Sequence, residues 1–97
     1  MQNDWVKYLN LAKKAGAVVF GIDEIIKCRS KIYLIILSEP QATQNLREKV
    51  NNFIAKKDTK IIKLDDDLNI FLNTDNCKVI GLTNENLANQ IKTYFKE

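Results

Sequence analysis

The sequence predicts an α/β protein in which helices cover a largely parallel or mixed central sheet of four strands. Helical and strand patterns alternate along the chain in the order α-β-α-β-α-β-α-β-α, which is typical of this class. The stretch KIYLIIL, residues 31–37, is apolar on both faces, as expected of a strand with helices on each side. The chain has 97 residues and a hydrophobic content of 45%, which suits a single domain over residues 1–97.

The first helix is expected over residues 4–16, because Asp4 can cap its N-terminus and Gly16 its C-terminus. Its apolar stripe at helical spacing consists of Trp5, Tyr8, Leu9, Leu11 and Ala12. Residues 17–20 are β-branched and aromatic and predict a short strand, after which Gly21 turns the chain.

The second helix is expected over residues 22–30 and the second strand over residues 31–37. On that helix one side carries Ile22, Ile25, Ile26 and Arg29. Residues 38–40 break the pattern, and Pro40 suits the first turn of a third helix because proline has no N–H to donate. The apolar face of the third helix is Leu46, Val50, Phe53 and Ile54.

The last part of the chain predicts two more strands, at residues 59–64 and 78–83. Between them, the acidic residues 65–67 open a helix, where their charge complements the helix dipole. That helix carries Leu68, Phe71 and Leu72. Thr83 or Asn84 caps the final helix. Its inward residues are Leu87, Ala88, Ile91, Tyr94 and Phe95.

The net charge of +3 is unevenly distributed along the chain. Residues 1–60 carry 11 Lys and Arg against 6 Asp and Glu, whereas residues 61–97 carry 4 against 6. The basic part either attracts a polyanion or is an ordinary solvated surface rich in lysine. The longest apolar run is far shorter than the ~20 residues that cross a bilayer. The N-terminus does not resemble a signal peptide, so we expect a cytoplasmic protein.

Catalysis, metal binding and cofactor binding are not expected. The chain has no histidine, which is the commonest general base and metal ligand, and no C-x-x-C or glycine-rich phosphate-binding motif. Cys28 and Cys77 are expected to be reduced core residues. A small enzyme or carrier that uses one of these thiols is the alternative.

The stretch FGIDEIIKCRS, residues 20–30, places two acids and a lysine on one face of the second helix. Lys27 follows Asp23 by four residues and Glu24 by three, so their tips can lie together. One interpretation is a capped helix with an ordinary ion pair. In the other, a carboxylate and a lysine read guanine edges. Gly21 would then let the backbone approach a phosphate of an RNA groove opened by non-standard pairing.

The segment LNLAKKAGAVVFGIDEIIKCRSKIYLIILSE resembles the start of the kink-turn-binding ribosomal protein family. That family includes the archaeal large-subunit protein seven-Ae, the large-subunit protein thirty-e, and a bacterial branch of YlxQ and YbxF type. Its helix end L-x-x-A-x-x-A-G matches residues 9–16, and its glycine-led helix matches residues 21–27. Near the C-terminus, DLNIFLNTDNCKVIGLTNENLANQI is similar to the family's D-L-x-x-x-x-G-…-V-x-I-A-V-T-D-x-x-x-A segment.

The resemblance implies a three-layer α-β-α sandwich and a non-catalytic, monomeric protein that binds ribosomal or other structured RNA, with the ribosome as a further candidate partner. In the family, the RNA face is formed by the glycine-led helix and the loop before the last strand. Glu24 and Lys27 would contact guanines of tandem sheared G·A pairs, while Gly21 would approach the backbone. The expected RNA-binding residues are Gly21, Asp23, Glu24, Lys27, Lys13, Lys14, Lys31, Asn76 and Lys78.

The sequence departs from the family pattern in ways that weaken RNA binding. Asp23 stands where RNA-reading members carry asparagine, and an ionised aspartate accepts hydrogen bonds without donating any. Ala17 replaces a frequent lysine, and Asn73 replaces a glycine. Lys13, Lys14, Lys27, Arg29 and Lys31 form either a basic rim for phosphates or a solvated surface. The alternative function is a protein-interaction module on the same fold that has lost specific RNA binding.

Overall fold

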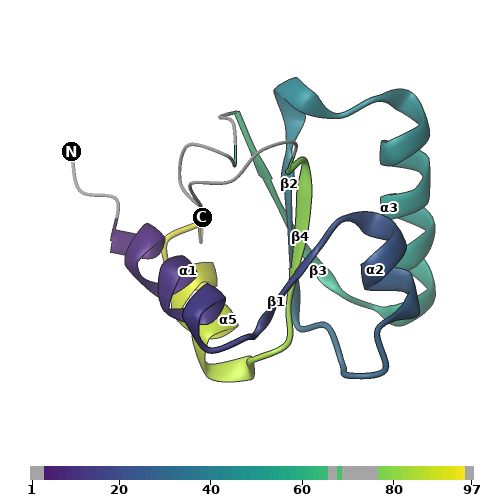
Figure 1. Ribbon diagram of the computed structural model, residues 1–97. Coiled ribbons are helices and arrows are strands. Elements are labelled where there is room, and N and C mark those ends of the chain that lie inside the picture. The colour runs from purple at the N-terminus through teal and green to yellow at the C-terminus, as the bar shows by residue number, and fades with distance from the viewer. Residues whose placement is uncertain (1–3, 66–67, 69–76, 96–97) are drawn as a thin grey trace.

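The computed structural model describes residues 4–65, 68 and 77–95 and confirms the predicted α/β class (Figure 1). In this part of the chain a four-stranded mixed sheet lies between two pairs of helices, which makes a three-layer α-β-α sandwich. The elements are α1 (Asp4–Lys14), β1 (Val18–Phe20), α2 (Ile22–Lys27), β2 (Leu34–Ser38), the 3₁₀ helix η1 (Glu39–Gln41), α3 (Gln44–Lys57), β3 (Lys60–Leu64), β4 (Val79–Leu82) and α5 (Glu85–Thr93).

The sheet has the strand order β1-β4-β2-β3. β4 pairs antiparallel with both β1 and β2, whereas β2 and β3 are parallel. This arrangement puts the end of β1, the start of β4 and the end of β2 at one end of the sheet, because Phe20 is opposite Ile80 and Leu37 is opposite Val79. We call it the β4-start end. The opposite end, where Leu82 pairs with Val18 and Leu34, is the β4-finish end.

The helices cover the two faces of the sheet in pairs, α1 with α5 and α2 with α3 (Figure 1). β2 alternates between them: Leu34 and Ile36 face the α1–α5 layer, and Ile35 and Leu37 face the α2–α3 layer. All four side chains are buried, which explains why the sequence of this strand is apolar on both faces.

Most predicted element boundaries lie close to the observed ones, but β2 begins at Leu34, three residues later than predicted, and two helices differ. α2 stops at Lys27 because Cys28 is extended, so Arg29 lies beyond the helix. Pro40 is not in the first turn of α3. It lies in η1, and Thr43 caps α3 by accepting a hydrogen bond from the Leu46 amide at 3.1 Å. The predicted helix after residue 65 lies outside the described residues, except for Asp65 and the buried Leu68.

Three apolar side chains that the helical spacing places toward the core are exposed instead. Leu11, Ile26 and Tyr94 are 49%, 52% and 47% exposed. Ile26 points away from the sheet because Ile22 and Ile25 already occupy the buried side of a helix of less than two turns.

Gly81 lets α2 approach the sheet closely. A Cβ atom at this position would lie 3.1 Å from Ile32 Cγ2 and 3.2 Å from Ile25 Cγ1. The missing side chain therefore makes room for Ile25, which anchors α2 on β4.

Candidate nucleic-acid interface

The start of α2 is fixed to the sheet by Gly21. Its amide donates to the Val79 carbonyl at 3.0 Å, and its carbonyl accepts from the Ile25 amide at 3.0 Å. Gly21 has φ 89° and ψ 146°, a backbone conformation that residues other than glycine rarely adopt. A Cβ atom there would meet nothing within 4 Å, so the glycine is required by the backbone turn and leaves open space beside it.

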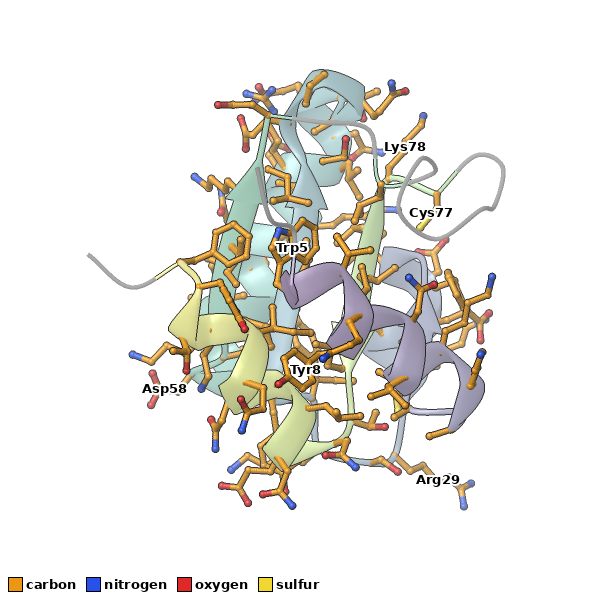
Figure 2. All side chains as sticks on the ribbon, turned by 90° about the vertical axis from the view of Figure 1, so that its left-hand side faces the viewer. Trp5, Tyr8, Arg29, Asp58, Cys77 and Lys78 are labelled. Atoms are coloured by element: carbon orange, nitrogen blue, oxygen red, sulfur yellow. The ribbon has the colours of Figure 1, made fainter. Side chains whose placement is uncertain are left out.

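Lys78 lies next to this turn. The Ser38 amide donates to the Lys78 carbonyl at 2.8 Å, and Val79 follows as the partner of Gly21. Lys78 itself is exposed at the β4-start end (Figure 2). The structure thus brings together the two parts of the predicted RNA face, the glycine-led helix and the residue before the last strand. Asn76, the other predicted residue of that loop, lies outside the described residues.

The exposed charged side chains of α2 differ in their surroundings. Glu24 and Lys27 face solvent, and neither makes an ion pair with any other described residue. Asp23 does not pair with Lys27, in contrast to the ion pair that the spacing predicts. Its Oδ1 lies 3.6 Å from Lys49 Nζ on α3, and both side chains are largely exposed. The negative charge of Asp23 is therefore partly offset by a residue that the sequence did not suggest.

The remaining predicted cations lie elsewhere. Lys13 and Lys14 lie in the last turn of α1, and Ala17 follows shortly before β1. The Ala17 carbonyl accepts a hydrogen bond from the Thr83 amide at 2.9 Å, so the two lysines lie near the β4-finish end of the sheet. Lys31 also belongs to that end, since it lies 5.1 Å over the Tyr33 ring and the Tyr33 amide donates to Leu82. Figure 2 shows Arg29 and Lys78 at opposite ends of the molecule. Lys13, Lys14, Lys31 and Arg29 of the predicted basic rim therefore lie away from Lys78 and the Gly21–Val79 hydrogen bond.

The aromatic residues of α1 do not form a base-stacking platform. Trp5 is 8% exposed and its ring packs edge-to-face on Phe95 with centroids 5.3 Å apart. Tyr8 is half-buried against the same core cluster, in agreement with its helical spacing.

The two cysteines are free, and they differ in environment. Cys77 is buried and Cys28 is half-buried, packed against the α2–α3 core. Within residues 4–65, 68 and 77–95 no group of three His, Cys, Asp or Glu side chains is placed to hold a metal ion. Across the same residues, none of the helices has the length and apolar character of a membrane span.

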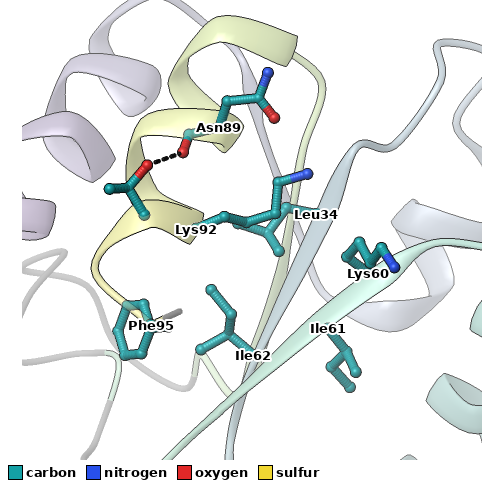
Figure 3. A pocket seen from close by; sticks show the side chains of 8 residues that line it. Leu34, Lys60, Ile61, Ile62, Asn89, Lys92 and Phe95 are labelled. Atoms are coloured by element: carbon teal, nitrogen blue, oxygen red, sulfur yellow. Dashed lines mark hydrogen bonds between the residues drawn. The ribbon is translucent and has the colours of Figure 1, made fainter. Parts of the chain in front are cut away.

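A hollow of about 490 Å³ lies between α5 and β3 (Figure 3). Leu34, Ile62 and Phe95 line it together with Lys60 and Lys92, and Thr93 Oγ1 beside it donates to the Asn89 carbonyl at 2.9 Å. Leu34 pairs with Leu82 and Lys60, so the hollow belongs to the β4-finish end. It is separate from the α2 turn.

Sequence reasoning missed Lys49 in this region, and it placed Ser38 only where the predicted second strand ends. Lys49 pairs with Asp23 across two helices, and Ser38 is buried at the point where β2 meets Lys78. The polar Ser38 comes at the end of a strongly apolar strand, and this change in polarity is a weak signal that the strand ends there. Nothing in the sequence spacing indicates the Asp23–Lys49 pair.

Comparison with known proteins supports the fold alone. No protein-family model matches the chain, and no curated protein matches its sequence. The solved structure of a protein with unknown function from Bacillus halodurans C superposes with a TM-score of 0.86. The alignment covers 99% of this chain and 100% of that one at 18% sequence identity.

Proposed function

We propose that this protein is a small, non-catalytic RNA-binding protein of the kink-turn-binding ribosomal protein family, which recognises structured RNA in the cytoplasm in association with the ribosome. The observation that carries the proposal is the hydrogen bond between Gly21 and Val79. It holds the start of α2 beside the exposed Lys78 while Glu24 and Lys27 point to solvent.

The chemistry of these groups suits guanine and phosphate. The Glu24 carboxylate can accept from the N1–H and N2–H₂ groups of a guanine, and the Lys27 ammonium can donate to O6 or N7. Lys78 supplies a positive charge for a phosphate beside the open space at Gly21. A regular A-form major groove is too narrow for α2, so the suitable target has a groove widened by non-standard pairs.

The test is a titration with a short kink-turn RNA that carries tandem G·A pairs, beside a duplex of equal length without them, at two salt concentrations. We expect tighter binding of the kink-turn RNA at both concentrations. Weak binding of both RNAs with the same salt dependence would reject the proposal, because it would show that the protein senses only phosphate charge.

A variant at Gly21 links that titration to the turn itself. Gly21→Ala places a side chain at positive φ and is expected to strain the start of α2 and to reduce the preference for the kink-turn RNA. Gly16→Ala is the matched control, because Gly16 also has positive φ (72°) with nothing within 4 Å of its Cβ position but follows α1 at the other end of β1. Equal loss of preference in both variants would contradict a specific role for the α2 turn.

A further inference from the structure

A groove runs between α2 and α3, with Ile26 and Phe53 as its apolar lining from the two helices. It consists of two adjoining hollows, of about 320 and 370 Å³, which share Ile26, Phe53 and Lys57. Figure 1 shows the two helices side by side on one face of the sheet. We call this feature the α2–α3 groove. One of its hollows continues past the end of α2 to Arg29, far from Lys78 (Figure 2).

The floor of the groove is apolar and accessible. Ile26 is 52% exposed, although Ile22 and Ile25 on the same short helix are buried. Phe53 is half-buried and packs against the α2–α3 core, and Ile32 closes one hollow from below. An isoleucine and a phenylalanine meeting in a concave surface are an anchor point of the kind found at the centres of protein interfaces.

The rim of the groove carries only positive charge. Its lining cations are Arg29, Lys31, Lys49, Lys56 and Lys57. No carboxylate is among the described residues that line either hollow. Lys49 forms an ion pair with Asp23, and Lys31 lies over the Tyr33 ring. By contrast, Lys56, Lys57 and Arg29 make no ion pair with a described residue. This electrostatic pattern complements a negatively charged partner.

We propose that the α2–α3 groove binds an acidic segment of another protein that inserts one or two apolar side chains between Ile26 and Phe53. The apolar floor favours a polypeptide over a nucleic acid, because Ile26 cannot stack on a base and phosphates gain nothing from an apolar floor. The acidic side chains of the segment would pair with Lys56, Lys57 and Arg29 around the anchor. This inference does not depend on RNA binding at the α2 turn.

The test is a selection of roughly twelve-residue random peptides, long enough for about three helical turns, against the intact protein. We expect the enriched peptides to be rich in Asp and Glu around Leu, Ile or Phe. Their affinities are then measured by fluorescence anisotropy against Ile26→Ser and Lys57→Glu. Each variant is expected to weaken binding about tenfold or more.

Leu11→Ser and Lys63→Glu are the matched controls. Leu11 is as exposed as Ile26 but lies on α1, and Lys63 is an exposed lysine on β3. Both should leave peptide binding unchanged, and thermal unfolding checks that all four variants fold. The proposal is overturned by a selection without enriched acidic–apolar peptides, or by equal weakening in Lys63→Glu and Lys57→Glu. It is also overturned if Ile26→Ser and Lys57→Glu weaken RNA binding while peptide affinity stays constant, which would make the groove an RNA surface.

Discussion

Glu24 and Lys27 are the residues whose substitution tests the RNA-reading chemistry most directly, because both are exposed and neither supports the core. If they contact guanine edges, Glu24→Ala and Lys27→Ala should each weaken binding of a kink-turn RNA by about 1–3 kcal/mol. Titration of each variant with that RNA measures the decrease in affinity. Glu48→Ala and Lys63→Ala remove the same charges elsewhere, from α3 and β3. Unchanged affinity in the α2 variants would exclude guanine readout by this helix.

The Asp23–Lys49 pair leads to a second prediction at the residue scale. Asp23→Asn and Lys49→Gln both break this exposed pair, so each should change the free energy of unfolding by less than about 1 kcal/mol. Their effects on RNA binding should be opposite. Asp23→Asn adds a donor and removes a negative charge, and it frees Lys49, so affinity should rise. Lys49→Gln leaves the Asp23 charge unbalanced, so affinity should fall. Two changes of the same sign in kink-turn titrations would reject this account of Asp23.

At the scale of elements, the position of α2 depends on the absence of a side chain at Gly81. Gly81→Val should force Ile25 and Ile32 to move, because even a Cβ atom would be 3.1–3.2 Å from them. We expect a decrease of about 1–3 kcal/mol in the free energy of urea unfolding, as for overpacked cores. Gly81→Ala should lie between the wild type and the valine variant. A valine variant within about 0.5 kcal/mol of wild type would show that α2 adjusts without strain.

The alternation of elements was predictable from the sequence because the strands are rich in β-branched and other apolar residues and the helices follow turn or cap residues. The stretch LIIL of β2 has no polar face, which required helices on both sides. Element ends were less predictable. α2 stops at Lys27 without a glycine to mark its end, and η1 holds Pro40 before the Thr43 cap. Thr43 is a standard cap residue, but Pro40 three residues earlier is also a helix-start signal, so the sequence contains two competing start signals for α3.

Residue spacing alone grouped only the neighbouring residues of the candidate site, whereas the family resemblance added Lys78. Gly21, Glu24 and Lys27 recur every three residues along less than two helical turns, so their spacing was sufficient to group them. Lys78 joins them through strand register, whereas Lys13, Lys14 and Lys31 belong to the other end of the sheet. The order of strands decides which charges meet, and a net charge counted along the chain contains no such information.

Across the whole molecule, the separation of the two ends of the sheet predicts two different roles for its lysines. Lys78→Gln removes a cation beside the α2 turn, so it should lower the preference for a kink-turn RNA over a duplex. Lys13→Gln with Lys14→Gln removes cations near the β4-finish end. If these two lysines neutralise phosphates, the plot of log binding constant against log salt concentration should become shallower in the double variant. The slope should change by about 0.7–0.9 for each phosphate that is no longer neutralised, and the change should be equal for both RNAs.

Titrations of both RNAs across a salt series separate these roles, with Lys63→Gln as a control on β3. The ratio of the two affinities should stay constant in the Lys13 and Lys14 double variant, because phosphate charge is common to both RNAs. A changed ratio in that variant would place Lys13 and Lys14 in specific recognition, and the RNA would then have to reach both ends of the sheet. If the ratio of the two affinities stays constant in the double variant and falls in Lys78→Gln, recognition is restricted to the β4-start end, where the Gly21 amide donates to the Val79 carbonyl.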